Sequence, residues 1–111
     1  MCERGEIWWA ELPEADGSGP SGRRPVVVIQ ADAFNRSAIG TTIVAMITGN
    51  LSRSEAPGNV LLPARQSGLP RDSVVSQLFT VDRTVLTERA SSLSGALMRK
   101  MEDGLRRVLE L

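Results

Sequence analysis

Apolar residues gather in short runs along the chain, separated by polar, glycine-rich and proline-rich stretches. The run at residues 26–29 is unbroken and entirely β-branched, which is typical of a strand buried on both faces. Proline has no amide hydrogen to donate to a neighbouring strand, so we expect Pro25 at the first position of this strand. Arg23 and Arg24 are then predicted at its end. Paired cations there either contact a ligand or form ordinary exposed surface.

Four further segments have the composition of strands, with β-branched or aromatic residues bounded by turn residues. After Ser94, apolar residues recur at helical spacing as far as Leu109, which predicts an amphipathic C-terminal helix. Several short strands and one helix favour a mainly β fold, a small barrel of about five to seven strands, in one domain over residues 1–111. The additional predicted strands are residues 5–12, 41–48, 59–63 and 73–81.

Composition restricts the chemistry available to the protein. The chain has no histidine and one cysteine, Cys2, so we expect no metal site, no internal disulfide and no cofactor. Without histidine, an enzyme here would use arginine, carboxylate, hydroxyl or thiol groups. No apolar run approaches the length of a membrane span, and the charged N-terminal residues do not have the pattern of a signal peptide, so we expect a cytoplasmic protein.

The net charge is zero, but the charges are distributed unevenly. Residues 1–16 carry five acidic residues and one arginine, whereas residues 23–71 carry six arginines and two acidic residues. Twelve of the thirteen basic residues are arginine. The guanidinium fork suits bidentate phosphate contacts, so the middle segment points to an anionic polymer. On these counts alone, however, we favour a simple compositional bias toward arginine over a binding role.

The order of the motifs resembles the MazF/PemK type of toxin endoribonuclease from toxin-antitoxin systems. The motifs are RGEIWWAEL, a Gly/Ser-rich loop, GRRPVVVI, VAMIT, RDSVV and QLFTVDR, and the resemblance covers nearly the whole chain. Its most specific element is an Arg-Pro pair that opens an aliphatic strand, followed at the expected spacing by an apolar strand that ends in threonine.

The resemblance implies an SH3-like barrel of the PemK type with a C-terminal helix. It also implies a homodimer that cuts single-stranded RNA, chiefly mRNA, at specific sequences and without a metal. Such cleavage inhibits translation and growth, and the resemblance implies that a cognate MazE-like antitoxin neutralises the toxin. The family's catalytic arginine falls on Arg24 and its catalytic threonine on Thr48.

The implied chemistry is consistent with these residue types. RNA supplies its own nucleophile, the ribose 2′-hydroxyl, so cleavage needs removal of its proton, stabilisation of the phosphorane and a proton for the 5′-oxygen. Arg24 can donate two parallel hydrogen bonds to the phosphate, whereas a guanidinium, which keeps its proton, is a poor base. Thr48 can hydrogen-bond a phosphate oxygen or orient the 2′-hydroxyl. The general base is left unassigned.

The remaining candidates are RNA-binding residues, each of which is also an ordinary loop or surface residue. In the first loop the family often has Gly-Ser-Glu where this chain has residues 17–19 as Gly-Ser-Gly, so the acidic residue is absent. The stretch before Gln77 is also shorter than the resemblance implies. The RNA-binding candidates are Arg23, Ser18, Ser52, Arg53 and Gln77.

Two alternatives stay open at this stage. The same barrel occurs in toxins that bind and poison DNA gyrase without cleaving anything. Their gyrase-directed C-terminus carries a tryptophan near its end, whereas the tryptophans here are Trp8 and Trp9. A peptide-binding SH3-like module would need an aromatic-lined groove, and the chain has four aromatic residues and no tyrosine.

Overall fold

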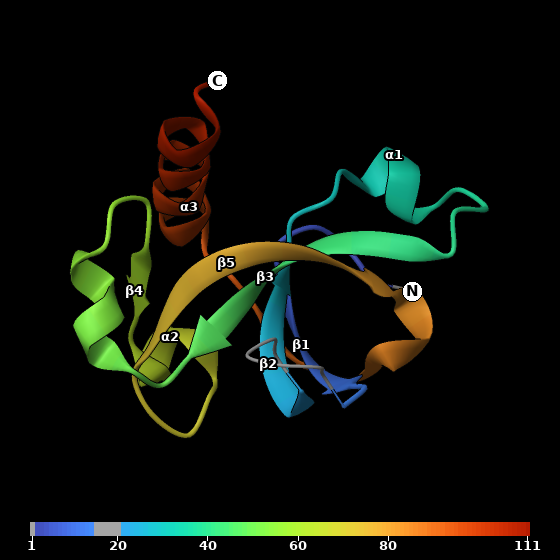
Figure 1. Cartoon of the computed structure of the whole chain (residues 1–111), viewed down its shortest axis with the longest axis horizontal. Helices are drawn as coiled ribbons and strands as arrows, with labels where there is room; N and C mark the ends of the chain where they lie inside the picture. Colours follow the sequence, from blue (N-terminus) through green and yellow to red (C-terminus); the bar gives the residue numbers. More distant parts are fainter. Residues whose placement is uncertain (1, 15–20) are drawn as a thin grey trace.

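The computed structural model describes residues 2–14 and 21–111. The chain forms one curled antiparallel sheet with a C-terminal helix (Figure 1). The strand order is β4-β5-β3-β2-β1-β6. The predicted small, mainly β barrel with a C-terminal helix is confirmed, in the form of a six-stranded half-barrel. The elements are β1 (Glu6–Leu12), β2 (Gly22–Val28), α1 (Asp32–Asn35), β3 (Thr41–Thr48), the 3-10 helix η1 (Leu51–Glu55), β4 (Val60–Leu62), α2 (Ala64–Ser67), β5 (Ser73–Asp82), the 3-10 helix η2 (Arg83–Val85), β6 (Leu86–Ser92) and α3 (Gly95–Leu109).

Strand β2 lies in the middle of the sheet and is longer than predicted. It begins at Gly22, so Arg23 and Arg24 lie within the strand, and Pro25 is opposite Trp9 of β1 rather than at a strand end. The prediction for Pro25 was wrong because the ladder to β3 begins only at Val26. The first half of β2 therefore has one unpaired edge, where a residue without an amide hydrogen is tolerated.

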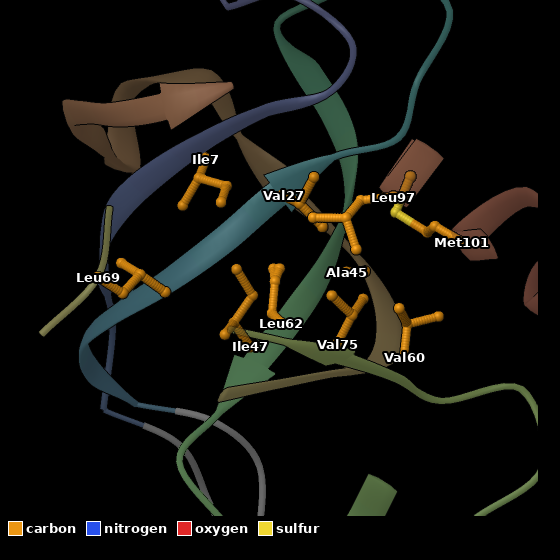
Figure 2. Close-up of a cluster of buried hydrophobic side chains, with 10 residues drawn as sticks. All are labelled: Ile7, Val27, Ala45, Ile47, Val60, Leu62, Leu69, Val75, Leu97 and Met101. Atoms are coloured by element: carbon orange, nitrogen blue, oxygen red, sulfur yellow. The ribbon is translucent and has the colours of Figure 1, made fainter. Parts of the chain in front are cut away.

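The sheet buries apolar side chains on both of its faces. Consecutive residues of a strand point to opposite faces, so Val27 belongs to one buried cluster and its neighbours Val26 and Val28 to the other. Figure 2 shows the first cluster, in which side chains of β1 to β5 meet Leu97 and Met101 of α3. Burial of the valine run on both faces confirms the prediction for this strand.

Strand β6 was not predicted from the sequence. Its residues LTERASS are mostly polar, none of them is buried, and the strand lies at the edge of the sheet. Its pairing with β1 is interrupted by two register shifts. An exposed, polar edge strand has no apolar pattern to reveal it, whereas residues 41–48, a mostly apolar run, coincide with β3 as predicted.

Helix α3 begins after Ser94, whose Oγ accepts a hydrogen bond from the amide of Leu97 at 3.2 Å. It crosses the loop before β4 at a backbone contact between two glycines. A Cβ on Gly104 would lie 2.3 Å from the carbonyl oxygen of Gly58, and Gly58 itself has a positive φ of 85°. The helix can therefore reach this position only because neither residue has a side chain.

We expect Gly104→Ala to destabilise the protein by about 1–3 kcal/mol, because the added methyl collides with backbone rather than with a flexible side chain. Urea unfolding followed by circular dichroism measures this. Gly95→Ala is the matched control, since its Cβ would meet only the guanidinium of Arg99 at 3.4 Å, and its stability should equal or slightly exceed that of the wild type. A Gly104→Ala protein as stable as the wild type would show that the loop moves away at little cost.

Candidate active site

A cavity of about 280 Å³ opens where β1, β2 and the end of β3 face the turn between α2 and β5. Larger hollows of about 390 and 490 Å³ lie along α3, but neither contains Arg24 or Thr48. Three arginines line the smaller cavity, which we call the arginine pocket. Its lining residues are Trp9, Arg23, Arg24, Pro25, Ile47, Thr48, Gly49, Leu69, Pro70, Arg71 and Ser73.

The register of the sheet brings Arg24 and Thr48 together. The ladder between β2 and β3 ends at the pair Val26 and Met46, so Arg24 comes two residues before this last pair on β2 and Thr48 two residues after it on β3. Both residues therefore lie just beyond the end of the ladder. Both residues line the arginine pocket, so the two predicted catalytic side chains share one site.

Within the described part of the chain, the side chains of Arg24 and Thr48 each make one hydrogen bond, to a nearby backbone group. The Nε of Arg24 donates to the carbonyl oxygen of Ser21 at 3.2 Å, and the side chain forms no ion pair with any residue that the structure describes. The Oγ1 of Thr48 accepts a hydrogen bond from the amide of Asn50 at 3.2 Å. The terminal guanidinium nitrogens of Arg24 and the hydroxyl hydrogen of Thr48 are thus available to an anion in the pocket.

Arg23 has a different environment from its neighbour. Its guanidinium forms ion pairs with Glu11 of β1 at 3.1 Å and with Glu88 of β6 at 2.8 Å. The same guanidinium lies over the ring of Trp9, 4.8 Å from its centroid. The hydrogen bonds to Glu88 and Glu11 raise the pKa of Arg23 above its ordinary value. The charge of Arg23 is therefore already compensated by two carboxylates.

Arg71 lies in the pocket and was not among the predicted site residues. The chain on both sides of Arg71 is held in place. Before it, Leu69 is buried; after it, the Asp72 carboxylate accepts the amide hydrogen of Ala64 at 2.8 Å. The Ser73 hydroxyl also donates a hydrogen bond to the backbone carbonyl of Arg71 at 3.1 Å. A Cβ on Gly49 would lie 3.8 Å from its Nε. Only the pairing of Thr48 with Val74 brings Arg71 beside the end of β3, and no local pattern signals this contact.

Ser52 and Arg53 lie on η1, just beyond the pocket, and neither lines it. The Ser52 hydroxyl donates to the side chain of Asn50 at 2.6 Å, and the carbonyl of Arg53 accepts from Asn59 at 2.8 Å. These contacts shape the loop without presenting either side chain to the pocket. Both residues stay predictions as RNA contacts.

Gln77 lies in the 490 Å³ hollow between β5 and α3, and the structure does not bring it together with Arg24. The ladder between β3 and β5 contains an irregularity between Ala45 and Ile47, next to Gln77. Its assignment as an RNA contact stays a prediction. Ser18 lies outside the described residues.

The comparisons with known proteins identify the family. The sequence profile of the PemK-like, MazF-like toxins of type II toxin-antitoxin systems matches residues 3–109. The chain belongs to this family. The resemblance read from its motifs is thereby confirmed.

Two full-length relatives of this MazF/PemK-family chain are named endoribonucleases. It is 48% identical over 113 residues to the endoribonuclease MazF6 of Mycobacterium tuberculosis, covering all of this chain and 99% of that protein. It is 37% identical to the endoribonuclease EndoA of Bacillus subtilis, and the match covers 100% of this chain and 97% of that protein. These names agree with the enzyme class predicted from the sequence.

A solved structure of a mycobacterial endoribonuclease in complex with its cognate antitoxin has the same fold as this MazF/PemK-family chain. The two superpose with a TM-score of 0.75 at 19% identity, over 99% of this chain and 94% of that one. Among the described residues, no helix of this toxin is long and apolar enough to cross a membrane.

Proposed function

We propose that this chain is a metal-independent endoribonuclease toxin that cleaves single-stranded RNA at the Arg24–Thr48 site. The enzyme class is that of its full-length relatives, which are endoribonucleases. The observation that carries the proposal is that Arg24 and Thr48 line one pocket just beyond the end of the ladder between β2 and β3. Arg71 supports it by adding a second cation, without an ion pair among the described residues.

The reaction is an internal displacement at phosphorus. The ribose 2′-oxygen loses its proton and bonds to phosphorus, the bond from phosphorus to the 5′-oxygen breaks, and the 5′-oxygen takes up a proton. The products are a 2′,3′-cyclic phosphate and a 5′-hydroxyl, and no water is consumed in this step. Arg24 donates hydrogen bonds to the phosphate oxygens as negative charge develops on them, and Thr48 orients the 2′-hydroxyl or a phosphate oxygen.

We expect the protein to cut single-stranded RNA in the presence of EDTA and to leave 2′,3′-cyclic phosphate and 5′-hydroxyl ends. The reason is that the substrate carries the nucleophile and Arg24 supplies the positive charge. Mass spectrometry of the cleaved RNA identifies the ends, and sequencing of the 5′ ends gives the sequence preference. Loss of cutting on chelation, restored by a divalent cation, would contradict metal independence.

Arg24→Lys should lower kcat about 100-fold, because an ammonium group cannot make the forked contact to a phosphate. Arg65→Lys is the matched control: Arg65 is an exposed arginine on α2 outside the pocket, and its variant should cut at the wild-type rate. Initial cleavage rates on a fluorogenic RNA compare the three proteins. Near-normal turnover by Arg24→Lys would remove Arg24 from the reaction.

The proposed active form is a homodimer. Two groups of exposed apolar side chains support this, one on α1 and the start of β3 and the other at the end of α3. These two regions rise on the same side of β5 (Figure 1). Burying them against a second copy would remove apolar surface from water. The exposed residues are Phe34, Ile39, Ile43, Val108, Leu109 and Leu111.

The proposed partner is a cognate antitoxin whose acidic, disordered segment covers the arginine pocket. A related mycobacterial endoribonuclease has been solved in complex with its cognate antitoxin. Arg24 and Arg71, which are placed to hold phosphates, would equally hold carboxylates.

If so, a peptide with the acidic C-terminal segment of the antitoxin should compete with a non-cleavable RNA, and the affinity for both should fall as salt rises. Fluorescence anisotropy of a labelled RNA whose cleavage position carries a 2′-deoxyribose measures the competition. Simultaneous binding of peptide and RNA, with neither weakening the other, would place the antitoxin away from Arg24.

A further inference from the structure

Alternation along β2 gives the arginine pocket two chemically different ends, because Arg24 leaves the strand on one side and Arg23 and Pro25 leave it on the other. One end is polar, with Arg24, Thr48 and Arg71, and neither arginine has an ion-pair partner among the described residues. The other end is formed by apolar side chains and planar groups. Its members are Trp9, Pro25, Ile47, Leu69 and Pro70, with the guanidinium of Arg23 stacked over the Trp9 ring.

Electrostatics separate the roles of the two ends. Arg23 together with Glu11 and Glu88 forms a cluster with a formal charge of minus one, so an approaching phosphate would have to displace a carboxylate to bind there. The opposite end carries two arginines, Arg24 and Arg71, that form no ion pair with any described residue. A nucleotide phosphate therefore binds at the Arg24 end, and the other end suits an uncharged group.

The guanidinium of Arg23 is held in a fixed plane. The ion pairs connect three neighbouring strands, because Arg23 belongs to β2, Glu11 to β1 and Glu88 to β6, and β1 lies between the other two. The Trp9 ring supports the guanidinium from one side. Guanidinium planes and aromatic rings are the surfaces on which proteins stack unpaired RNA bases.

We propose that Trp9 and Arg23 form a stacking wall for a nucleobase next to the scissile phosphate, in the pocket that Leu69 and Pro70 also line. This rests on the proposed function, and it gives Arg23 the role of a base contact rather than of a phosphate contact. The cavity of about 280 Å³ is shared by the phosphate at its polar end and by this one base. Sequence preference at that nucleotide would then be read here.

The two tryptophans provide a direct readout. They are consecutive in β1 and so point to opposite faces, and the Nε1 of Trp8 donates to the Glu6 carboxylate at 3.1 Å, outside the pocket. The probe is an RNA oligonucleotide copied from a site that the wild type cleaves, with 2′-deoxyribose at the cleavage position. It should quench the emission of the Trp8→Phe protein, which retains Trp9, and leave that of the Trp9→Phe protein nearly unchanged.

A double-mutant cycle links Arg23 to the base. Arg23→Ala and removal of the base from one nucleotide flanking the cleavage position should each weaken binding about tenfold, and together no more than either alone. The salt dependence of binding should keep the wild-type slope in Arg23→Ala and lose about 0.7 in Arg71→Ala. Arg65→Ala, outside the pocket, controls for a general loss of charge.

Arg23→Lys shows whether a folding defect, rather than a lost base contact, weakens binding. Lysine retains the positive charge that pairs with Glu11 and Glu88 but has no planar group on which a base can stack. This variant should unfold at about the same urea concentration as the wild type. Its affinity for the intact RNA should nevertheless fall about tenfold, while its affinity for the RNA that lacks the flanking base should equal that of the wild type. Additive losses in the cycle, a reduced salt slope in Arg23→Ala, or unquenched Trp9 emission would overturn the inference. A wild-type protein that cuts no RNA would instead refute the proposed function.

Discussion

The burial of the valine run in β2 is the constraint on which the site depends. Val26, Val27 and Val28 are all fully buried, and they are divided between the two faces of the sheet. Moving the strand along by two residues would put Arg24 at the position of Val26, where a charge would have no partner and no water. The registers with β1 and β3 are therefore fixed, and they set the end of the ladder beyond which Arg24 and Thr48 line one pocket.

Two adjacent arginines acquire different chemistry from this arrangement. Arg23 and Arg24 are consecutive in β2 and leave the strand on opposite sides, so they meet different neighbours although both line the arginine pocket. Arg23 finds two carboxylates and an aromatic ring, whereas Arg24 contacts only a backbone carbonyl among the described residues. What each cation can bind is decided by the charges already beside it, and these come from strands β1 and β6.

The sequence predicted the buried strands, the C-terminal helix and the pair Arg24 and Thr48 because each has a local signal: an apolar run, a helical period or a recognisable motif. Three features had none. Strand β6 is polar and exposed, so no alternation marks it. Arg71 reaches the pocket only through the pairing of β5 with the end of β3. Gln77 lies next to an irregularity in that same pairing, and the sequence does not show on which side of the sheet such a residue lies.

The stacking wall that Arg23 forms depends in part on an ion pair with Glu88, at an edge of the sheet. Glu88 belongs to β6, the outermost strand, whose ladder to β1 is broken twice, whereas the ladder between β2 and β3, just beyond whose end Arg24 and Thr48 lie, is central and regular. Edge segments with few buried contacts open locally at a lower free energy than core strands do. Fraying of β6 would release the guanidinium plane while the phosphate end stayed intact, so the two ends of a single pocket have separate local stabilities.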